Sequence, residues 1–118
     1  MRLKLVLFLL TLSPVISATD YYVKNGGNNN ADGKSDATAW ATISKVNSTS
    51  LQPGDVVFFR CGDRWRETLE VPRSGSSSAY IKFTKYGQGQ NPKIVGSNSS
   101  SGWTNTSGNI WKSNSTFQ

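Results

Sequence analysis

The sequence predicts an all-β fold, a solenoid of stacked coils preceded by one short helix. Residues 56–76 align without gaps over residues 80–100 at an offset of 24, and short apolar runs alternate with turns rich in Gly, Ser and Asn. A period of about 20–50 residues is typical of a solenoid, because each coil covers the apolar face of its neighbour. A sandwich of antiparallel strands is the alternative, since strands at about 12-residue spacing also suit it.

The first 18 residues have the pattern of a signal peptide. Arg2 and Lys4 precede an apolar run over residues 5–12, and small residues lead to Ala18,. The run would rise only about 12 Å as a helix, far less than the bilayer core of about 30 Å. We therefore expect cleavage after Ala18 and no membrane attachment afterwards. The mature chain is expected to be secreted, whether extracellular, periplasmic or at the cell surface.

Composition excludes several kinds of function. Loss of Arg2 and Lys4 would leave 11 basic and 7 acidic residues, and the resulting charge of +4 is scattered along the chain. A nucleic-acid partner would require a clustered basic face, so none is expected. The sequence contains no His and only one cysteine, Cys61. Catalytic or metal-binding arrangements that depend on His, and disulfides within the chain, are therefore excluded.

The elements before the repeat follow in order. Residues 20–24 are aromatic and β-branched and predict a strand, and the Asn/Gly-rich residues 25–33 predict a loop,. A short amphipathic helix is expected next, capped by Ser35 or Asp36. Its apolar positions are Ala39, Trp40, Ile43 and Val46. Residues 53–54, Pro-Gly, have the residue types of a type II turn that leads into the repeat,.

Residues 55–118 are expected to form the first coils of the solenoid. The offset of 24 pairs Val57 with Ile81 and Phe59 with Phe83, and it pairs Glu70 with Ile94 and Val71 with Val95. Alternation predicts that Val57, Phe59, Cys61, Ile81 and Phe83 point inward, and that Lys82 and Thr84 point outward. After a Ser/Asn-rich insert that ends at Gly108, Ile110 and Trp111 would begin a third coil. We expect the solenoid to be incomplete at its C-terminal end.

The order of these features resembles the N-terminal cap and first coils of pectin-lyase-like proteins. The resemblance covers nearly all of residues 21–96, and it depends on residues 21–23, 26–33, 37–43, 51–59, 62–69, 74–75, 81–89 and 92–94. It implies a right-handed parallel β-helix whose capping helix, within residues 19–54, closes one end of the solenoid. The coils would be triangular, with three short parallel strands each.

The resemblance also implies a class of function. The family includes secreted polysaccharide lyases, uronan epimerases, glycosidases and noncatalytic surface proteins. We expect the full-length protein to be a monomer that cleaves or binds a polysaccharide, as a lyase, a hydrolase, or a noncatalytic adhesion or carbohydrate-binding protein. In the lyase members, the resemblance implies calcium-binding acids and a Lys or Arg base in the middle coils, and this arrangement maps onto no residue here. We therefore expect no catalytic residue and no cofactor in this chain, with calcium possible in downstream coils.

The candidate substrate-binding residues are Arg64, Trp65 and Arg66. An indole can stack on a sugar face, and flanking guanidinium groups can pair with uronate carboxylates. The alternative is structural: Trp65 would cover the edge of a coil, and the arginines would pair with Asp63 or Glu67.

Three weaker patterns also have structural alternatives. Asn28, Asn30, Asp32 and Gly33 fit half of a calcium loop, but the twelfth position is Ala39 instead of Glu, so a turn is favoured,. Asp63, Glu67 and Glu70 could supply an acid–base pair or could be solvated surface groups. Four N-x-S/T sequons are possible glycosylation sites, with the exposed turns after residue 97 expected to contain three of them, at Asn98, Asn105 and Asn114; the fourth is at Asn47,.

Overall fold

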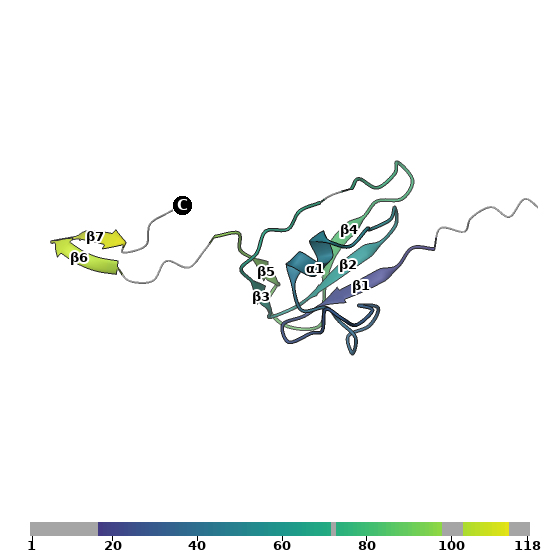
Figure 1. Ribbon diagram of the computed structural model, residues 1–118, viewed down its shortest axis with the longest axis horizontal. Helices are drawn as coiled ribbons and strands as arrows, with labels where there is room; N and C mark the ends of the chain where they lie inside the picture. The colour runs from purple at the N-terminus through teal and green to yellow at the C-terminus, as the bar shows by residue number, and fades with distance from the viewer. Residues whose placement is uncertain (1–16, 72, 98–102, 114–118) are drawn as a thin grey trace, which may run out of the picture.

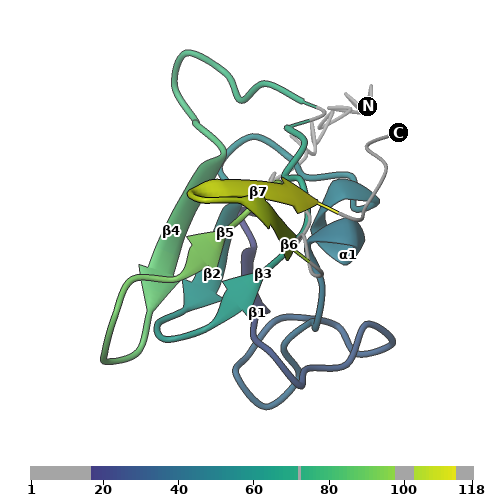
Figure 2. The same ribbon diagram turned by 90° about the vertical axis from the view of Figure 1, so that its left-hand side faces the viewer.

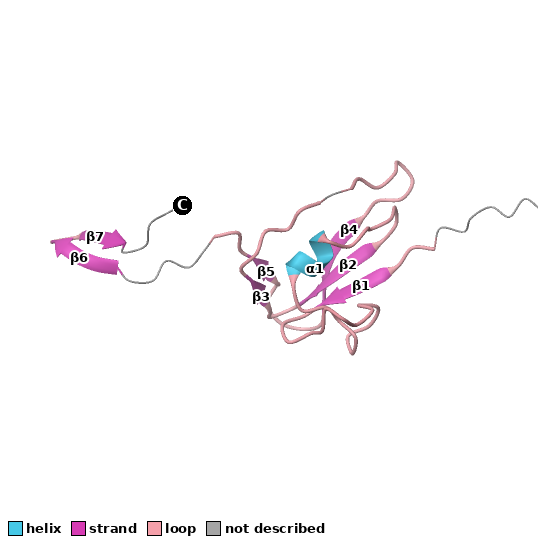
Figure 3. Cartoon of the chain, in the orientation of Figure 1, coloured by secondary structure: helices cyan, strands magenta, loops and turns pink. Residues whose placement is uncertain are grey.

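The computed structural model describes residues 17–71, 73–97 and 103–113, so the predicted signal peptide lies almost entirely outside the described residues. Strands predominate in these parts of the chain, and α1 is a single short helix (Figure 3). The all-β prediction is confirmed. The elements in chain order are β1 (Asp20–Val23), α1 (Ile43–Asn47), β2 (Val56–Arg60), β3 (Arg64–Trp65), β4 (Lys82–Tyr86), β5 (Lys93–Ile94), β6 (Trp103–Ser107) and β7 (Ile110–Ser113).

Two sheets of parallel strands make up the main body. β1, β2 and β4 lie side by side in that order, and β3 pairs with β5 (Figure 1). The chain forms β2 and β3 in one pass and β4 and β5 in the next, and each later strand pairs with its earlier counterpart. Parallel pairing within the repeat is therefore confirmed, and the antiparallel sandwich is wrong for these strands.

The register of the repeat differs from the predicted offset of 24. Val57 pairs with Phe83 and Phe59 with Lys85, an offset of 26, whereas Trp65 pairs with Ile94, an offset of 29. The turn between β4 and β5 is three residues longer than the turn between β2 and β3, and a gapless alignment cannot include that difference. The predicted pairing of Val71 with Val95 is also wrong, because the Val95 amide donates to the Trp65 carbonyl at 2.8 Å and Val71 is 59% exposed.

The inward and outward assignment of the side chains is confirmed. Val57, Phe59 and Cys61 are buried, Phe83 is half-buried, and Lys82 is exposed. The assignment survives the wrong register because an error of two residues leaves each side chain on the same face of a strand. Val57 and Phe59 belong to one buried cluster, and Phe83 packs against it; the other members are Val23, Trp40, Ile43, Val46, Leu51 and Trp65.

The helix begins later than predicted. α1 has Thr42 as its N-cap, and the Thr42 hydroxyl accepts a hydrogen bond from the Lys45 amide at 3.2 Å. Trp40 is not helical, because its amide donates to the Tyr22 carbonyl at 2.9 Å and its carbonyl accepts from the Lys24 amide. The Ser35 hydroxyl accepts from the Thr38 amide in a local turn instead.

α1 lies on the opposite side of the body from β4 in Figure 2. Ile43 and Val46, the buried residues of α1, pack into the same core cluster as Val57 and Phe59. Trp40 is 3% exposed and stacks on Tyr21 with ring centroids 4.8 Å apart. The expected packing of Trp40 and Ile43 against the first coil is therefore confirmed.

The segment after residue 102 forms an antiparallel hairpin of β6 and β7. The expectation that Ile110 and Trp111 begin a third parallel coil is therefore wrong, and the insert that ends at Gly108 contains the strand β6. Gly108, with φ of 54°, supplies the backbone conformation that the tight turn requires,. Within the described parts of the chain, α1 is too short to cross a membrane, and no other helix there could do so.

Candidate functional site

The structure divides the three predicted binding residues between the core and the surface. Trp65 is 3% exposed, its indole N–H donates to the Ala41 carbonyl at 2.9 Å, and its ring meets Phe59 edge-on at 5.6 Å. Arg64 and Arg66 are exposed, as alternation along an extended segment requires,. In this arrangement the core encloses the indole, and only the two arginines reach the surface.

The neighbouring carboxylates are bonded to backbone amides and leave the arginines unpaired. Asp63 accepts from the Asn25 amide at 2.8 Å. The two oxygens of Glu67 accept from the amides of Ile43 and Ser44 at 3.1 and 3.0 Å. The expected pairing of the arginines with these carboxylates is therefore wrong. Within the described residues the single ion pair joins Lys24 to Asp36, so neither Arg64 nor Arg66 forms an ion pair with a residue of these segments.

Asn25 fixes the backbone from which Arg64 projects. Its side-chain oxygen accepts from the Arg64 amide at 3.1 Å, and its side-chain nitrogen donates to the Arg64 carbonyl at 3.3 Å. These two bonds connect the loop after β1 to the start of β3. The loop thus positions Arg64, a role that the sequence alone did not indicate.

The carboxylates Asp63, Glu67 and Glu70 have different surroundings. Asp63 and Glu67 are engaged as described above, and Glu70 is exposed, with its amide donating to the Asn47 side chain at 3.0 Å. The half calcium loop is an Asx-turn segment: Asn28 accepts from the Asn30 amide and Asp32 from the Lys34 amide,. No group of three or more acidic, Cys or His residues within the described ranges could hold a metal ion.

An aromatic cluster on the outer face of the β1–β2–β4 sheet escaped the sequence reasoning. Tyr22 stacks on Phe58 at 5.2 Å and meets Tyr86 edge-on at 5.1 Å. The Tyr86 hydroxyl donates to Asp36 at 2.7 Å, and Lys24 binds the other oxygen of that carboxylate at 3.2 Å. The sequence shows that each of these aromatic residues occupies an outward position of its strand. Their mutual contact depends on the register between the strands, which the repeat did not predict correctly.

The contacts of this cluster shift two pKa values in opposite directions. Burial, followed by the bond to Asp36, raises the pKa of Tyr86 well above its usual range. The Tyr86 hydroxyl and then the Lys24 ammonium hold the pKa of Asp36 below its ordinary value, because both stabilise the ionised carboxylate,. The cluster thus joins the loop that contains Asp36 to β4.

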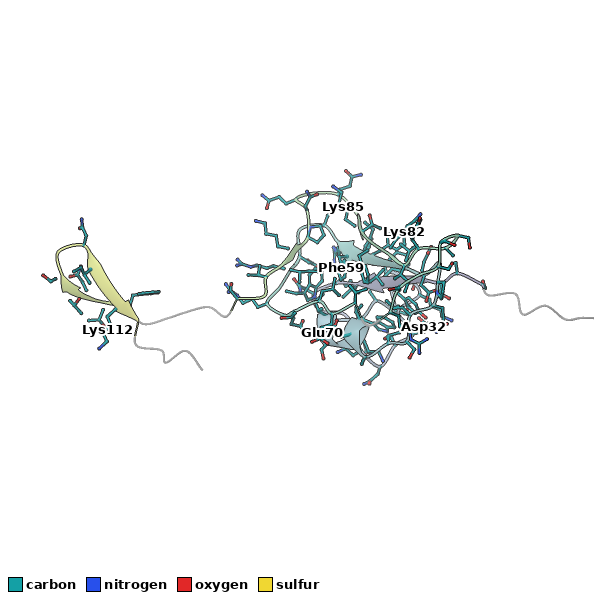
Figure 4. The ribbon with its side chains drawn as sticks, turned by 90° about the horizontal axis from the view of Figure 1, so that it is seen from above. Asp32, Phe59, Glu70, Lys82, Lys85 and Lys112 are labelled. Atoms are coloured by element: carbon teal, nitrogen blue, oxygen red, sulfur yellow. The ribbon has the colours of Figure 1, made fainter. Side chains whose placement is uncertain are left out.

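A groove of about 510 Å³ lies on the other side of the sheet. It is lined by apolar side chains, with Thr84, Lys85 and Asn91 as polar members; the apolar ones are Phe59, Leu69, Phe83, Pro92 and Ile94. Figure 4 shows Phe59 within the body and Lys85 at its periphery. β4 and β5 each have only one strand partner in the described part of the chain, so the groove lies beside two open strand edges.

Cys61 is a buried free thiol, in agreement with its inward assignment. The Asn47 sequon lies at α1, where its side-chain amide donates to the Thr68 carbonyl at 2.8 Å. Asn105 lies on the exposed strand β6. Asn98 and Asn114 lie outside the described residues.

Comparison with solved structures points to sugar-active proteins. The chain is similar to the GH136 lacto-N-biosidase from Eubacterium ramulus, with 29% identity over 63% of this chain and TM-scores of 0.60 for the selenomethionine derivative and 0.59 for the native protein. It is also similar to XylC in complex with xylose, with 26% identity over 79% of this chain and a TM-score of 0.63. The chain spans only 12–14% of the length of these proteins. No protein-family model and no curated protein matches the sequence significantly.

Proposed function

We propose that this chain is the N-terminal part of a secreted, right-handed parallel β-helix protein that binds or cleaves extracellular polysaccharide. The observation that carries the proposal is the strand-on-strand parallel pairing of successive passes of the chain. The likeness to a lacto-N-biosidase and to XylC with bound xylose supports the carbohydrate assignment. Crossovers between parallel strands are right-handed in about 98% of cases, which supports the handedness.

The open edges of β4 and β5 support continuation of the solenoid. A further coil would pair with both strands and would cover the groove between them, in which Phe83 and Ile94 are only half-buried. Stacking of this kind is how a solenoid buries a continuous apolar core. The antiparallel hairpin of β6 and β7 would then be an insertion between coils.

Arg64 and Arg66 are the residues for which a polysaccharide contact is proposed. They are two residues apart on an extended segment, so their Cα atoms are about 6.6 Å apart on the same side of the chain. Both are exposed, and neither pairs with a carboxylate of the described residues. Guanidinium groups bind carboxylates with two parallel hydrogen bonds, which favours an acidic polysaccharide over a neutral one.

We infer that this part of the protein binds the polysaccharide and that any catalytic cleavage takes place in downstream coils. Asp63 and Glu67, which could have formed an acid–base pair, accept hydrogen bonds from backbone amides. A noncatalytic surface protein remains the second candidate, because exposed arginines serve adhesion equally well. Release of unsaturated or reducing ends by the entire secreted polypeptide would distinguish the enzyme from the adhesion protein.

Affinity electrophoresis in gels that contain polygalacturonate, alginate or xylan tests the binding proposal. The double variant Arg64→Ala/Arg66→Ala should bind the acidic polymers at least about tenfold more weakly, which corresponds to about 1.4 kcal/mol. The control Lys34→Ala/Arg73→Ala removes the same charge from exposed positions elsewhere. Equal losses in the two variants, or wild-type binding to xylan alone, would contradict the assignment of the arginines.

A further inference from the structure

Asp55 is a buried carboxylate without a cationic side chain as partner. It is 2% exposed and lies in the turn that leads into β2. Its Oδ1 accepts from the Thr19 backbone nitrogen at 2.9 Å, and its Oδ2 accepts from the Gln52 amide at 2.8 Å. Two amide donors offset only part of the cost of burying an ionised group. An additional positive charge at this position would therefore stabilise the fold.

Thr19 is held in place by hydrogen bonds at both its backbone nitrogen and its carbonyl. The Thr19 carbonyl accepts from the Val56 amide at 3.0 Å, immediately before β1 begins to pair with β2. Ser17 and Ala18, which precede it, are exposed. The position of this nitrogen is thus fixed by the strand pairing and does not depend on the residues that precede it.

We propose that hydrolysis of the bond between Ala18 and Thr19 creates an α-ammonium group that forms a buried ion pair with Asp55 and locks β1 against β2. This inference depends on the proposed secretion of the protein and on the signal-peptide cleavage after Ala18 that the sequence predicts. An endopeptidase adds water across the bond: the C–N bond breaks, the water oxygen joins the Ala18 carbonyl carbon to give a carboxylate, and both water hydrogens end on the Thr19 nitrogen. A neutral donor at 2.9 Å from Oδ1 thereby becomes a cationic one.

Other charged groups near Asp55 do not replace this partner. The Tyr21 phenol on β1 has a pKa raised first by burial and then by the Asp55 charge, so it stays neutral below its ordinary pKa of about 10,. On β4, the Lys82 amide donates to the Asp55 backbone carbonyl at 2.9 Å, while its side chain is exposed. Asp20, next to Thr19, is exposed. The α-ammonium group would thus be the cation that contacts the buried carboxylate.

The ion pair has a defined dependence on pH. An α-amino group ordinarily has a pKa of about 7.7–8.0, and a carboxylate in contact raises it. Because the pKa in the folded protein is raised, the stabilisation is fully present below the ordinary pKa. It is lost as the pH rises through the raised pKa.

The test compares three forms of the chain that all end at Gln118. One begins at Thr19 with a free amine, one is the same chain acetylated at that amine, and one begins at Ser17. Competitive acylation followed by peptide mapping gives the pKa of each free α-amine. The Thr19 amine should label at least about tenfold more slowly than the Ser17 amine near pH 6.5, where both amines are mostly protonated, which corresponds to a rise of about one pKa unit. Equal labelling rates would overturn the proposal.

Two further measurements make every outcome decisive. Asp55→Asn should restore ordinary labelling of the Thr19 amine. If that variant does not fold, the acetylated form replaces it: its thermal midpoint should be lower than that of the free-amine form at pH 6, and the two should converge at high pH. Identical midpoints at pH 6 would refute the ion pair.

Failure of the inference can be told apart from failure of the proposed function. The full chain from Met1 is produced in a secreting host, and the N-terminus of the exported product is read by mass spectrometry. A start other than Thr19 would overturn both the cleavage and the ion pair. A start at Thr19 with an ordinary α-amine pKa would overturn the ion pair alone. Polysaccharide binding, measured separately, depends on neither result.

Discussion

At the scale of single residues, the indole N–H groups of two tryptophans attach loops to the core. Trp40 donates to the Ala31 carbonyl at 3.0 Å and Trp65 to the Ala41 carbonyl at 2.9 Å, and both rings are buried. Buried tryptophan typically finds such a partner for its polar atom. Gly33 allows the Trp40 contact, because a Cβ at this residue would lie 2.4 Å from the Trp40 ring and its φ is +71°,.

Phe59→Asp should be among the most damaging single substitutions. Phe59 is 4% exposed and contacts Trp65, so the change would bury an unpaired carboxylate and leave a void. We expect a loss of more than about 3 kcal/mol in the free energy of unfolding. Arg64→Ala, on the exposed side of β3, should change it by less than about 0.5 kcal/mol. Chemical denaturation that ranked the two variants in the opposite order would contradict the inward assignment of Phe59.

Tyr86→Phe should raise the pKa of Asp36 toward its ordinary value of about 3.9. The substitution removes the hydroxyl that is the principal cause of the lowered pKa, and it leaves Lys24 in place. Because the pKa of Asp36 is depressed in the folded protein, its stabilising effect is present above the ordinary pKa and is lost as the pH falls through the depressed value. Carboxyl NMR titration measures this directly, and an unchanged pKa in the variant would disprove the contact.

At the scale of secondary structure, α1 depends on groups outside the helix. It is five residues long, too short to be stable alone. Thr42 caps one amide, and Glu67, 23 or more residues away, accepts from two others. The anchoring of α1 is therefore a long-range property, and the helical spacing of apolar residues could not locate its start.

Glu67→Ala should destabilise the protein by about 1–3 kcal/mol, because two amides at the start of α1 lose their acceptor. Amide hydrogen exchange at Ile43 and Ser44 should become faster in this variant. Glu70→Ala is the matched control, since the Glu70 side chain is exposed and the hydrogen bond from Glu70 to Asn47 comes from the backbone amide. Slow exchange at both amides in Glu67→Ala would show that the cap is dispensable.

At the scale of the whole molecule, the parallel register sets which side chains meet. β1 pairs with β2 at an offset of 36 residues and β2 with β4 at an offset of 26. The longer first offset accommodates the loop after β1, α1 and the turn before β2. Together these two registers bring Tyr22 of β1, Phe58 of β2 and Tyr86 of β4 into one aromatic cluster.

Paired cysteines should distinguish the observed register from an offset of 24. In a Cys61→Ala background, Val56→Cys/Lys82→Cys places register partners on adjacent strands, about 4.8 Å apart and within disulfide range,. Val56→Cys/Tyr80→Cys, at an offset of 24, would separate the Cα atoms by about 8 Å, beyond that range. Mild oxidation should cross-link the first pair much faster, as measured by peptide mapping. Preferential cross-linking of the second pair would favour the offset of 24.

The candidate site could be predicted only in part. The sequence grouped Arg64, Trp65 and Arg66 as candidate binding residues, but the assignment of Trp65 to the core and of Glu67 to α1 required the folded chain. The bond between Thr19 and Asp55 joins residues 36 positions apart, and no local pattern indicates it. Sequence spacing fixes the direction of a side chain, whereas its partner depends on the path of the connecting loops.

The sequence by itself determined the strand character of the chain and the face on which each strand side chain lies. These properties depend on a two-residue alternation that is local and is unaffected by a slip of two residues. Tertiary structure alone decided the register, the start of α1, the hairpin after residue 102 and the partners of Glu67 and Asp55. Each of these depends on turn lengths and on contacts between distant residues, which become favourable only when the core is packed.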